Sequence, residues 1–342
     1  MNGNIKIFAT LFMAAILAIS INLPVEAQST NYQQVNVPFS LDGESPGENI
    51  PLGSTIIHNG DITQVYGPDN SLFLQAQDSN TGIISTPFGA KKATYVYNIP
   101  SGSHIAENGD ATQVYSNGVV ILTVEDNNGI ESANPANQIT QSNSNGWIEQ
   151  TKDWSVSNLD FSTGLWTVPS SPPNPSPSVV DYLFNAIQNN PGQNIILQPV
   201  LEWNQFGTHI WTGQSWYASN GNYYASSKIN VAVGDGISGV MQYVGGLNGW
   251  YIIFQDNRTG QQTSITTSVL GTSNLAVFCT LESGLASKLS DLPGSTLFTN
   301  MTFQYQNNNI NIPWVAQINS PPGISGLYIV IYSSASVLLG VP

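Results

Sequence analysis

The sequence predicts an all-β protein, a β-sandwich of two antiparallel sheets preceded by a small N-terminal β module. Short segments of alternating apolar and polar residues recur along the chain, separated by Gly, Asn and Asp turns. Long stretches of helical periodicity are absent from residues 143–342. Hydrophobic residues make up 41% of the 342 residues, which is enough for a sizeable core. Many short strands joined by turns are typical of a sandwich rather than of alternating strands and helices.

Residues 1–27 are predicted to be a secretory signal peptide. Lys6 precedes an apolar run over residues 7–23, and residues 25–27 offer a small-residue cleavage site. A membrane anchor is the alternative, although the run is slightly short for a spanning helix. We therefore expect a secreted, extracellular protein.

Residues 28–128 are predicted to form a two-repeat β module. Residues 50–66 and 99–115 share an Ile-Pro start, an Asn-Gly-Asp turn and a Thr-Gln-Val-Tyr end. This order is typical of a β-hairpin. Residues 129–146 are interpreted as an exposed linker, and residues 147–342 as the sandwich domain. The module is interpreted as a pro-segment, with an accessory adhesive module as the alternative.

The charge of the chain excludes two classes of partner. Seven Lys and Arg residues stand against 21 Asp and Glu residues, which gives a net charge of −14. A surface with so few positive charges cannot neutralise phosphates, so nucleic acid and anionic lipid are not expected as partners. Because few basic groups are present, protonating the carboxylates leaves only a small positive charge. This composition suits an acidic medium.

The common catalytic and metal-binding patterns do not fit the sequence. His58, His104 and His209 are too dispersed for a zinc site. His209 is the only histidine of residues 147–342, and no Gly-x-Ser-x-Gly motif accompanies it. Cys279 lies in an apolar run and is expected to be a buried strand residue. We expect neither a metal nor a cofactor.

Carboxamide and carboxylate side chains remain as candidates for catalytic residues. In the strand predicted over residues 194–203, alternation places Gln198 and Glu202 on one face and Trp203 on the opposite, core face. Glu282 ends an otherwise apolar strand. A partly desolvated carboxyl there has a raised pKa and suits a general base working in acid. The structural alternative is a solvated charge at the end of a strand.

Residues 147–303 resemble the glutamic peptidases (eqolisins), secreted acid endopeptidases with a β-sandwich fold. Residues 161–169 give the most specific match, Phe-Ser-Thr-Gly-Leu-Trp-Thr-Val-Pro. Residues 194–198 resemble the segment that ends in the family's catalytic Gln, and residues 278–282 lie where the family has its catalytic Glu. Other segments that match in order are residues 145–147, 215–217, 233–237, 259–262 and 297–303. The order and spacing of these segments carry the resemblance.

The resemblance implies a role for each candidate residue. Glu282 would act as the general base on a water molecule, and Gln198 would orient this water and donate a hydrogen bond to the developing oxyanion. The residues implied to support the site or to line the cleft are Glu202, Trp166, Trp203, Trp216 and Tyr217. The implied partners are protein or peptide substrates and the chain's own pro-segment, and we expect a monomer.

The sequence departs from the family pattern at Pro199, which is expected to place its strand at a sheet edge or to bend it. Ala218 stands where the family has a Glu. The alternative function is a non-catalytic carbohydrate-binding or cell-surface sandwich protein. Its candidate sugar-stacking residues are Trp211, Trp216, Tyr217, Tyr223 and Tyr224. The other interpretation of these aromatic residues is that they fill the core or line peptide subsites.

Overall fold

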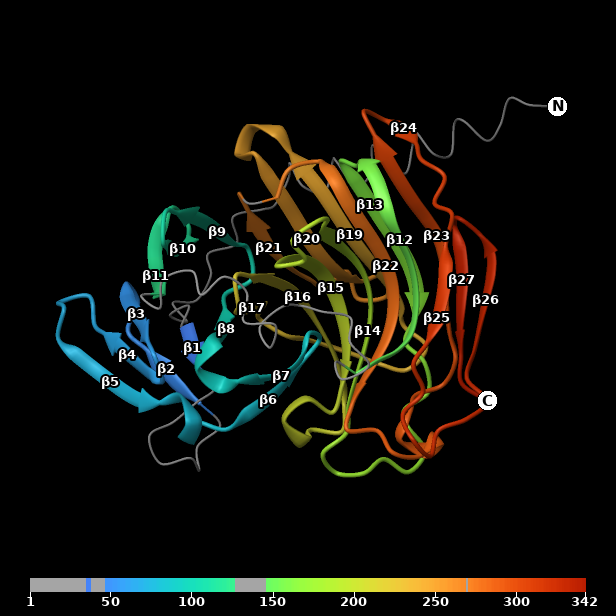
Figure 1. Ribbon diagram of the computed structural model, residues 1–342, viewed down its shortest axis with the longest axis horizontal. Coiled ribbons are helices and arrows are strands. Elements are labelled where there is room, and N and C mark those ends of the chain that lie inside the picture. The colour runs from blue at the N-terminus through green and yellow to red at the C-terminus, as the bar shows by residue number, and fades with distance from the viewer. Residues whose placement is uncertain (1–34, 38–46, 127–145, 269) are drawn as a thin grey trace. The chain divides into compact units, whose positions relative to one another are not determined.

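Strands dominate the computed structural model, which describes residues 35–37, 47–126, 146–268 and 270–342 (Figure 1). Two large sheets, mostly of antiparallel neighbours, form a sandwich. The helical segments of the described residues are short 3₁₀ turns. None of them has the length and apolar character needed to cross a membrane. The predicted all-β sandwich is therefore confirmed.

The first sheet contains 11 strands of the described residues. They are β1 (Val35–Val37), β2 (Glu48–Ile50), β8 (Val96–Ile99), β12 (Trp147–Asn158), β14 (Val180–Asn189), β15 (Ile195–Trp203), β16 (Trp211–Ser219), β17 (Asn222–Ser226), β18 (Ile229–Val231), β22 (Ser273–Gly284) and β25 (Val315–Ile318). Their order is β2-β1-β8-β17-β16-β15-β14-β22-β12-β25, and β18 pairs with β16. Strands β14, β15 and β22 thus lie inside the sheet.

The second sheet contains 14 strands of the described residues. They are β3 (Ser54–Asn59), β4 (Ile62–Tyr66), β5 (Leu72–Gln77), β9 (Ser103–Asn108), β10 (Ala111–Ser116), β11 (Val119–Asp126), β13 (Phe161–Thr167), β19 (Gly236–Val244), β20 (Gly249–Asp256), β21 (Gln262–Thr267), β23 (Thr296–Tyr305), β24 (Asn308–Asn309), β26 (Tyr328–Ser333) and β27 (Ser336–Gly340). Their order is β26-β27-β23-β13-β19-β20-β21-β9-β10-β11-β3-β4-β5, and β24 pairs with β23.

A separate two-stranded sheet consists of β6 (Ile83–Thr86) and β7 (Gly89–Lys92), here called the β6–β7 hairpin. The 3₁₀ segments are η1 (Asp78–Asn80), η2 (Ala93–Tyr95), η3 (Gln205–Gly207), η4 (Gly245–Leu247) and η5 (Leu289–Asp291). Of the predicted segments, residues 1–27 and nearly all of residues 129–146 lie outside the described residues.

The N-terminal repeats form the two predicted hairpins, β3–β4 and β9–β10. Strand β11 joins them, because it is antiparallel to β10 and parallel to β3. Two further parallel pairs, β8 with β17 and β9 with β21, connect the repeats to the sandwich. Both large sheets therefore contain strands that precede residue 127 and strands that follow residue 145. The described residues from Val35 to Pro342 belong to one compact unit.

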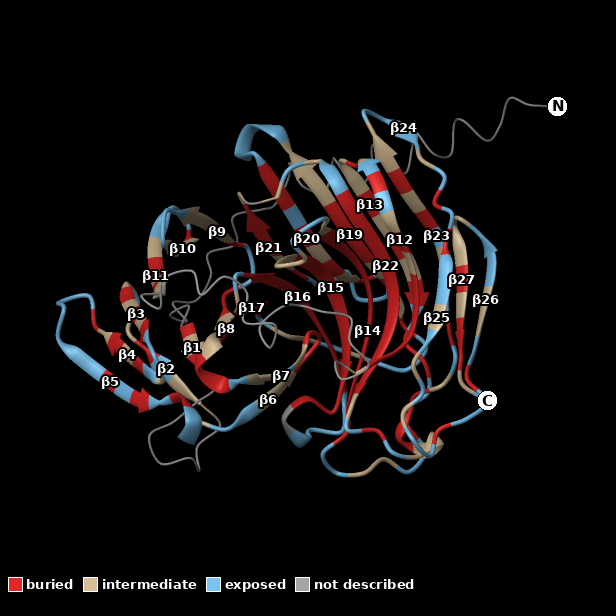
Figure 2. Ribbon diagram, in the orientation of Figure 1, coloured by how far each residue is buried: buried red, intermediate tan, exposed pale blue. Residues whose placement is uncertain are grey.

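The main core lies between the two large sheets. Leu197 and Leu201 on β15 contribute to it, as do Ile252 and Phe254 on β20. Figure 2 shows the buried residues concentrated on the inner strands of the first sheet, such as β14, β15 and β22. The predicted alternation of β15 is confirmed, because its odd-numbered leucines belong to this core.

Pro199 lies within a central strand, so the expectation of a sheet edge is wrong. Strand β15 pairs with β14 on one side and with β16 on the other, and Pro199 is opposite Ser215 on β16. The pairing with β14 has a gap at residues 198–199 and resumes in the same register, and Pro199 has no N–H to donate. A Cβ at Gly239 on the facing β19 would lie 2.8 Å from the Pro199 ring, so the glycine makes room for it.

Gly213 on β16 allows the two sheets to approach each other closely. A Cβ at this position would lie 1.9 Å from the buried Phe254 ring. We expect Gly213→Ala to lower the free energy of unfolding by about 1–3 kcal/mol, as overpacking does in a tight core. Denaturant unfolding measures this change. The matched control is Gly236→Ala, where the nearest atom would be 3.7 Å from the new Cβ. Equal stability of the two variants would contradict this account.

Candidate active site

Gln198 and Glu282 lie on the same face of the first sheet, the one turned away from the main core. Gln198 shares a face of β15 with Val200, two residues on, and Glu282 shares a face of β22 with Phe278, four residues before it. Val200 and Phe278 belong to a second apolar cluster on this face. We call this surface the site face. Gln198 is 0% and Glu282 1% exposed. The structure therefore places both predicted catalytic residues in one buried region.

The strand register determines how the polar residues of the site face are arranged. Tyr182 on β14 pairs with Glu202 on β15 and with Glu282 on β22, so these three residues form a row across the sheet. Gln198 lies four residues before Glu202 on the same strand, which is roughly 13 Å along it. Gln198 and Glu282 are therefore related diagonally, and a third segment of the chain connects them.

That third segment is the turn of the β6–β7 hairpin. Gln198 Nε2 donates a hydrogen bond to the carbonyl oxygen of Pro87 at 3.4 Å. The Gly89 N–H donates a hydrogen bond to Glu282 Oε1 at 2.9 Å. Phe88 lies between them in the chain and is fully buried. Figure 1 shows β6 and β7 extending from the N-terminal repeats toward β14 and β15.

Phe88 occupies an aromatic pocket on the site face. Its ring centroid lies 5.9 Å from that of Trp216 and 5.2 Å from that of Tyr223. The three side chains belong to the second apolar cluster, which is distinct from the core between the sheets. On β7, the Lys91 ammonium lies 5.1 Å from the centroid of the Tyr223 ring. The hairpin is thus held by apolar contacts as well as by hydrogen bonds.

Burial controls the protonation of Glu282. Desolvation raises the pKa of this carboxyl well above its usual value, while the Gly89 N–H, the Trp147 indole and the Lys91 ammonium act in the opposite direction without cancelling it. Burial also lowers the pKa of Lys91, although the Glu282 charge opposes this effect. The covered site therefore favours the neutral carboxyl, which cannot accept a proton from water.

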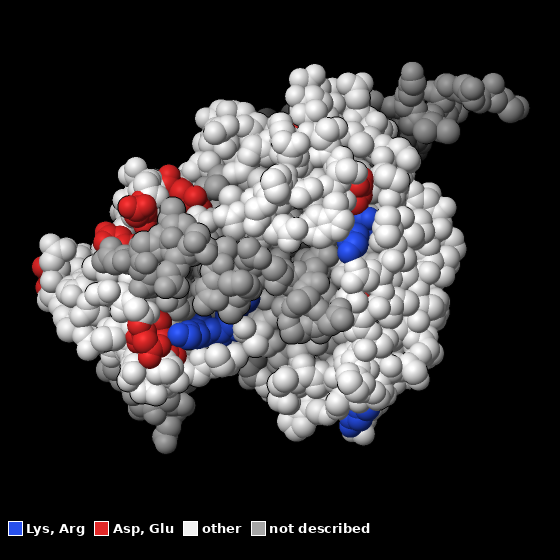
Figure 3. Space-filling model, viewed as in Figure 1, with Lys and Arg blue, Asp and Glu red and all other residues white. Residues whose placement is uncertain are grey.

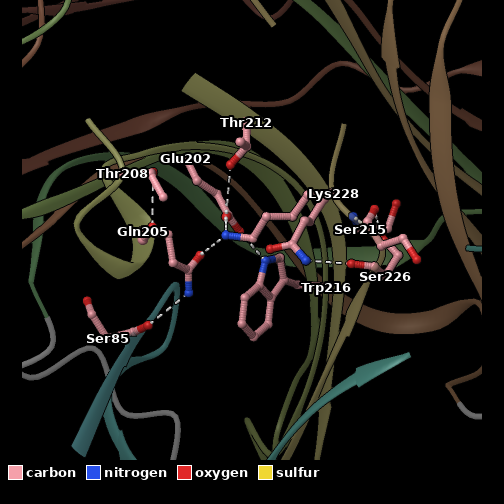
Figure 4. Close-up of polar contacts among 11 residues, drawn as sticks. Ser85, Glu202, Gln205, Thr208, Thr212, Ser215, Trp216, Ser226 and Lys228 are labelled. Atoms are coloured by element: carbon pink, nitrogen blue, oxygen red, sulfur yellow. Dashed lines mark hydrogen bonds and ion pairs between the residues drawn. The ribbon is translucent and has the colours of Figure 1, made fainter. Parts of the chain in front are cut away.

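Glu202 forms the centre of a second polar network on the site face (Figure 4). Trp216 Nε1 donates a hydrogen bond to Glu202 Oε1 at 2.5 Å. Lys228 Nζ and Thr212 Oγ1 lie 3.5 and 3.4 Å from Glu202 Oε2. Burial raises the pKa of Glu202, while Lys228 and these hydrogen bonds act against the rise. Glu202 thereby fixes Trp216, which lines the pocket of Phe88.

Three of the residues expected to support the site or to line the cleft do not lie on the site face. Trp166, Trp203 and Tyr217 are buried in the core between the sheets, so the prediction that they line the cleft is wrong. The physical reason is the period of two: Trp203 follows Glu202, and Tyr217 follows Trp216, so each points to the other side. Trp216 and Glu202 do lie on the site face.

The five aromatic residues considered for sugar stacking are all buried. Trp211, Tyr217 and Tyr224 belong to the main core, and Trp216 and Tyr223 lie against Phe88. None of the five presents a free ring face to solvent. This placement favours the interpretation that they fill the core or line a peptide subsite.

The sequence patterns did not indicate the hairpin turn, Gln205 or Lys228. Gln205 Nε2 donates a hydrogen bond to the Ser85 carbonyl of β6 at 3.3 Å, and its Oε1 accepts one from Lys228 Nζ at 3.5 Å (Figure 4). The available signal was the stretch Thr-Pro-Phe-Gly at residues 86–89, typical of a tight turn with Pro second and Gly fourth. That signal predicts a turn but not the surface on which it docks.

Cys279 is buried in β22, as expected. Within the described part of the chain, no group of three or more His, Cys, Asp or Glu side chains is placed to hold a metal ion.

Comparisons with known proteins find similar solved structures at low sequence identity. A crystal structure of scytalido-glutamic peptidase with a peptide-based transition-state analogue matches with a TM-score of 0.43 and 17% identity, covering 57% of this chain and 98% of that one. SCP-B, a member of the eqolisin family in complex with the tripeptide Ala-Ile-His, has a TM-score of 0.43 and 17% identity, with 58% and 98% covered. The CBM2 module of an evolved Dit from Lactobacillus casei BL23 phage J-1 has a TM-score of 0.27 and 10% identity, with 73% and 88% covered. No family model matches the sequence, and no curated protein matches it.

Proposed function

We propose that this chain is an exported acid endopeptidase in which Gln198 and Glu282 activate water for peptide-bond hydrolysis. One observation carries the proposal: both side chains contact the main chain of a single peptide turn, Gln198 at the Pro87 carbonyl and Glu282 at the Gly89 N–H. Peptide hydrolysis needs a donor for the carbonyl oxygen and an acceptor for the proton of water. The motifs of residues 147–303 support the glutamic peptidase class.

In the proposed reaction, ionised Glu282 removes a proton from a water molecule, and the water oxygen attacks the carbonyl carbon of the substrate. Gln198 Nε2 donates a hydrogen bond to the carbonyl oxygen as negative charge develops on it. The C–N bond then breaks, and protonated Glu282 returns the proton to the leaving amine. A carboxamide suits the role of Gln198, because it donates and accepts hydrogen bonds without carrying a charge. Glu202 supports the site by holding Trp216.

Gln198→Ala tests this assignment. The variant removes a hydrogen bond that strengthens in the transition state, so we expect kcat for a denatured protein substrate at about pH 4 to fall roughly a hundredfold, with a smaller change in KM. The rates are measured on acid-incubated protein, and Gln261→Ala, at an exposed position, is the control. Hydrolysis by Gln198→Ala at the wild-type rate would contradict the role of Gln198.

A further inference from the structure

We infer that the β6–β7 hairpin is an internal inhibitor whose turn occupies the peptide-binding site, an inference that rests on the proposed function. Its occupant is part of this chain, because Pro87 and Gly89 make the hydrogen bonds to Gln198 and Glu282. The turn and both catalytic candidates are buried together. A substrate can therefore reach the two side chains only after the hairpin moves.

The contacts of the turn are offset in a way that prevents cleavage. Gln198 holds the carbonyl of Pro87, whereas Glu282 accepts from the N–H of Gly89, two residues further on. To cleave the bond after Pro87, Glu282 would have to face a water molecule beside the Pro87 carbonyl carbon. Glu282 Oε1 instead accepts the Gly89 N–H. The turn thus occupies Glu282, the proposed base, while it makes main-chain contacts like those expected of a substrate peptide.

The shape of the turn adds to this block. Thr86 Oγ1 donates a hydrogen bond to the Gly89 carbonyl at 2.7 Å and accepts one from the Phe88 N–H at 3.2 Å. The Phe88 nitrogen is the one that would leave if the bond after Pro87 were cut. Gly89 has a φ of 83°, a conformation that favours glycine. The segment is therefore a closed turn, and the Phe88 nitrogen, which would be the leaving group, is already hydrogen-bonded to Thr86.

Contacts that involve side chains hold the hairpin in place, because neither of its strands pairs through backbone hydrogen bonds with a strand of the two large sheets. Strands β6 and β7 pair with each other in their own two-stranded sheet. An isolated hairpin is marginally stable in water. Its position consequently depends on the Phe88 ring between Trp216 and Tyr223 and on the Ser85 carbonyl bonded to Gln205.

The remainder of the N-terminal module is attached much more firmly. Strand β8 pairs with β17, and β9 pairs with β21, so the module continues both large sheets. The Tyr217 hydroxyl on β16 also donates a hydrogen bond to Glu107 Oε1 on β9 at 3.2 Å. Activation therefore requires displacement of the hairpin and leaves the rest of the module in place.

Phe88→Ala in the full chain tests the inference, and Phe73→Ala is the matched control. Phe73 lies on β5 of the same module and is 45% exposed, whereas Phe88 is fully buried. Loss of the Phe88 anchor is expected to raise the initial rate of cleavage of a fluorogenic peptide at about pH 4 by more than about tenfold and to shorten any lag. Hydrogen exchange of the β6 and β7 amides should also accelerate in Phe88→Ala. Phe73→Ala should match the wild type in both measurements.

The two readouts separate this inference from the proposed function. The three proteins are the wild type, Phe88→Ala and Phe73→Ala. If hydrogen exchange of the β6 and β7 amides is faster in Phe88→Ala but none of the three proteins hydrolyses the peptide, the proposed peptidase function is overturned, and the inhibitory role with it. The hairpin would then only cover the site face. Hydrolysis at equal rates in all three proteins would overturn the inhibitor but not the peptidase. If Phe88→Ala does not fold, Thr86→Val removes the hydroxyl that closes the turn at nearly constant shape, and the same two outcomes apply.

Discussion

Glu282→Gln is expected to slow peptide hydrolysis strongly without unfolding the protein. Glutamine has nearly the shape of a protonated glutamate, but it cannot take a proton from water. General base catalysis contributes typically 10²–10⁴-fold, so we expect kcat to fall at least about a hundredfold. The measurement is cleavage of a fluorogenic peptide at about pH 4, made in the Phe88→Ala background so that the hairpin no longer limits access.

The pH dependence of the free energy of unfolding gives a second, independent test of Glu282→Gln. Burial raises the pKa of Glu282, so the folded protein holds this proton more tightly than the unfolded chain does. The resulting stabilisation is complete in acid, below the unfolded pKa, and is lost as the pH rises through the folded pKa. Glu282→Gln should therefore match the wild type in acid and exceed its stability at neutral pH. The control is Glu48→Gln, at a partly exposed position of β2. Wild-type turnover by Glu282→Gln would contradict the role of general base.

Local patterns were sufficient to predict much of the fold. Residues 50–66 and 99–115 form hairpins because their strand and turn signals lie within a few residues of each other. The parallel pairing of β8 with β17 and of β9 with β21 joins strands far apart in the chain, and no local sequence feature specifies such partners. The extension of both sheets by the module could therefore not be predicted.

The candidate site likewise combines features that local patterns predict with features that depend on strands far apart in the chain. The period of two correctly placed Gln198 and Glu202 on one face of β15, because that rule needs only the strand itself. The same rule places Trp203 in the core, where the structure has it, so the cleft position that the family resemblance implies for Trp203 is wrong. The row of Glu202, Tyr182 and Glu282 depends on the register of three strands, and the docking of Phe88 depends on tertiary packing.

The distribution of charge connects the sequence to the proposed acidic medium. Figure 3 shows that most of the visible face carries neither basic nor acidic side chains. Several carboxyls are instead buried, and desolvation raises the pKa of Glu149, Asp181, Glu202 and Glu282. Each of these groups binds a proton more tightly in the folded state than in the unfolded state. Through these four groups, folding is favoured in acid and weakened as the pH rises, whereas the lowered pKa values of Asp235 and Asp291 act in the opposite direction.

Glu149→Gln is expected to remove a large part of this pH dependence. Glu149 on β12 is fully buried; its Oε1 accepts the Gly340 N–H at 3.2 Å, and desolvation raises its pKa to about 8. From an unfolded value near 4.5, this difference corresponds to on the order of 5 kcal/mol of stability. That stability is present below about pH 4.5 and is lost as the pH rises toward about 8.

The measurement is the free energy of unfolding by denaturant at about pH 4 and at about pH 8.5. The wild type should be markedly less stable at the higher pH, whereas Glu149→Gln, which stays neutral, should lose much less between the two conditions. Glu125→Gln, at a partly exposed position of β11, should follow the wild type. A Glu149→Gln profile parallel to that of the wild type would mean that the carboxyl ionises without cost. Water would then have to reach Glu149 between β12 and β27, and the tight packing of Gly340 against it would be wrong.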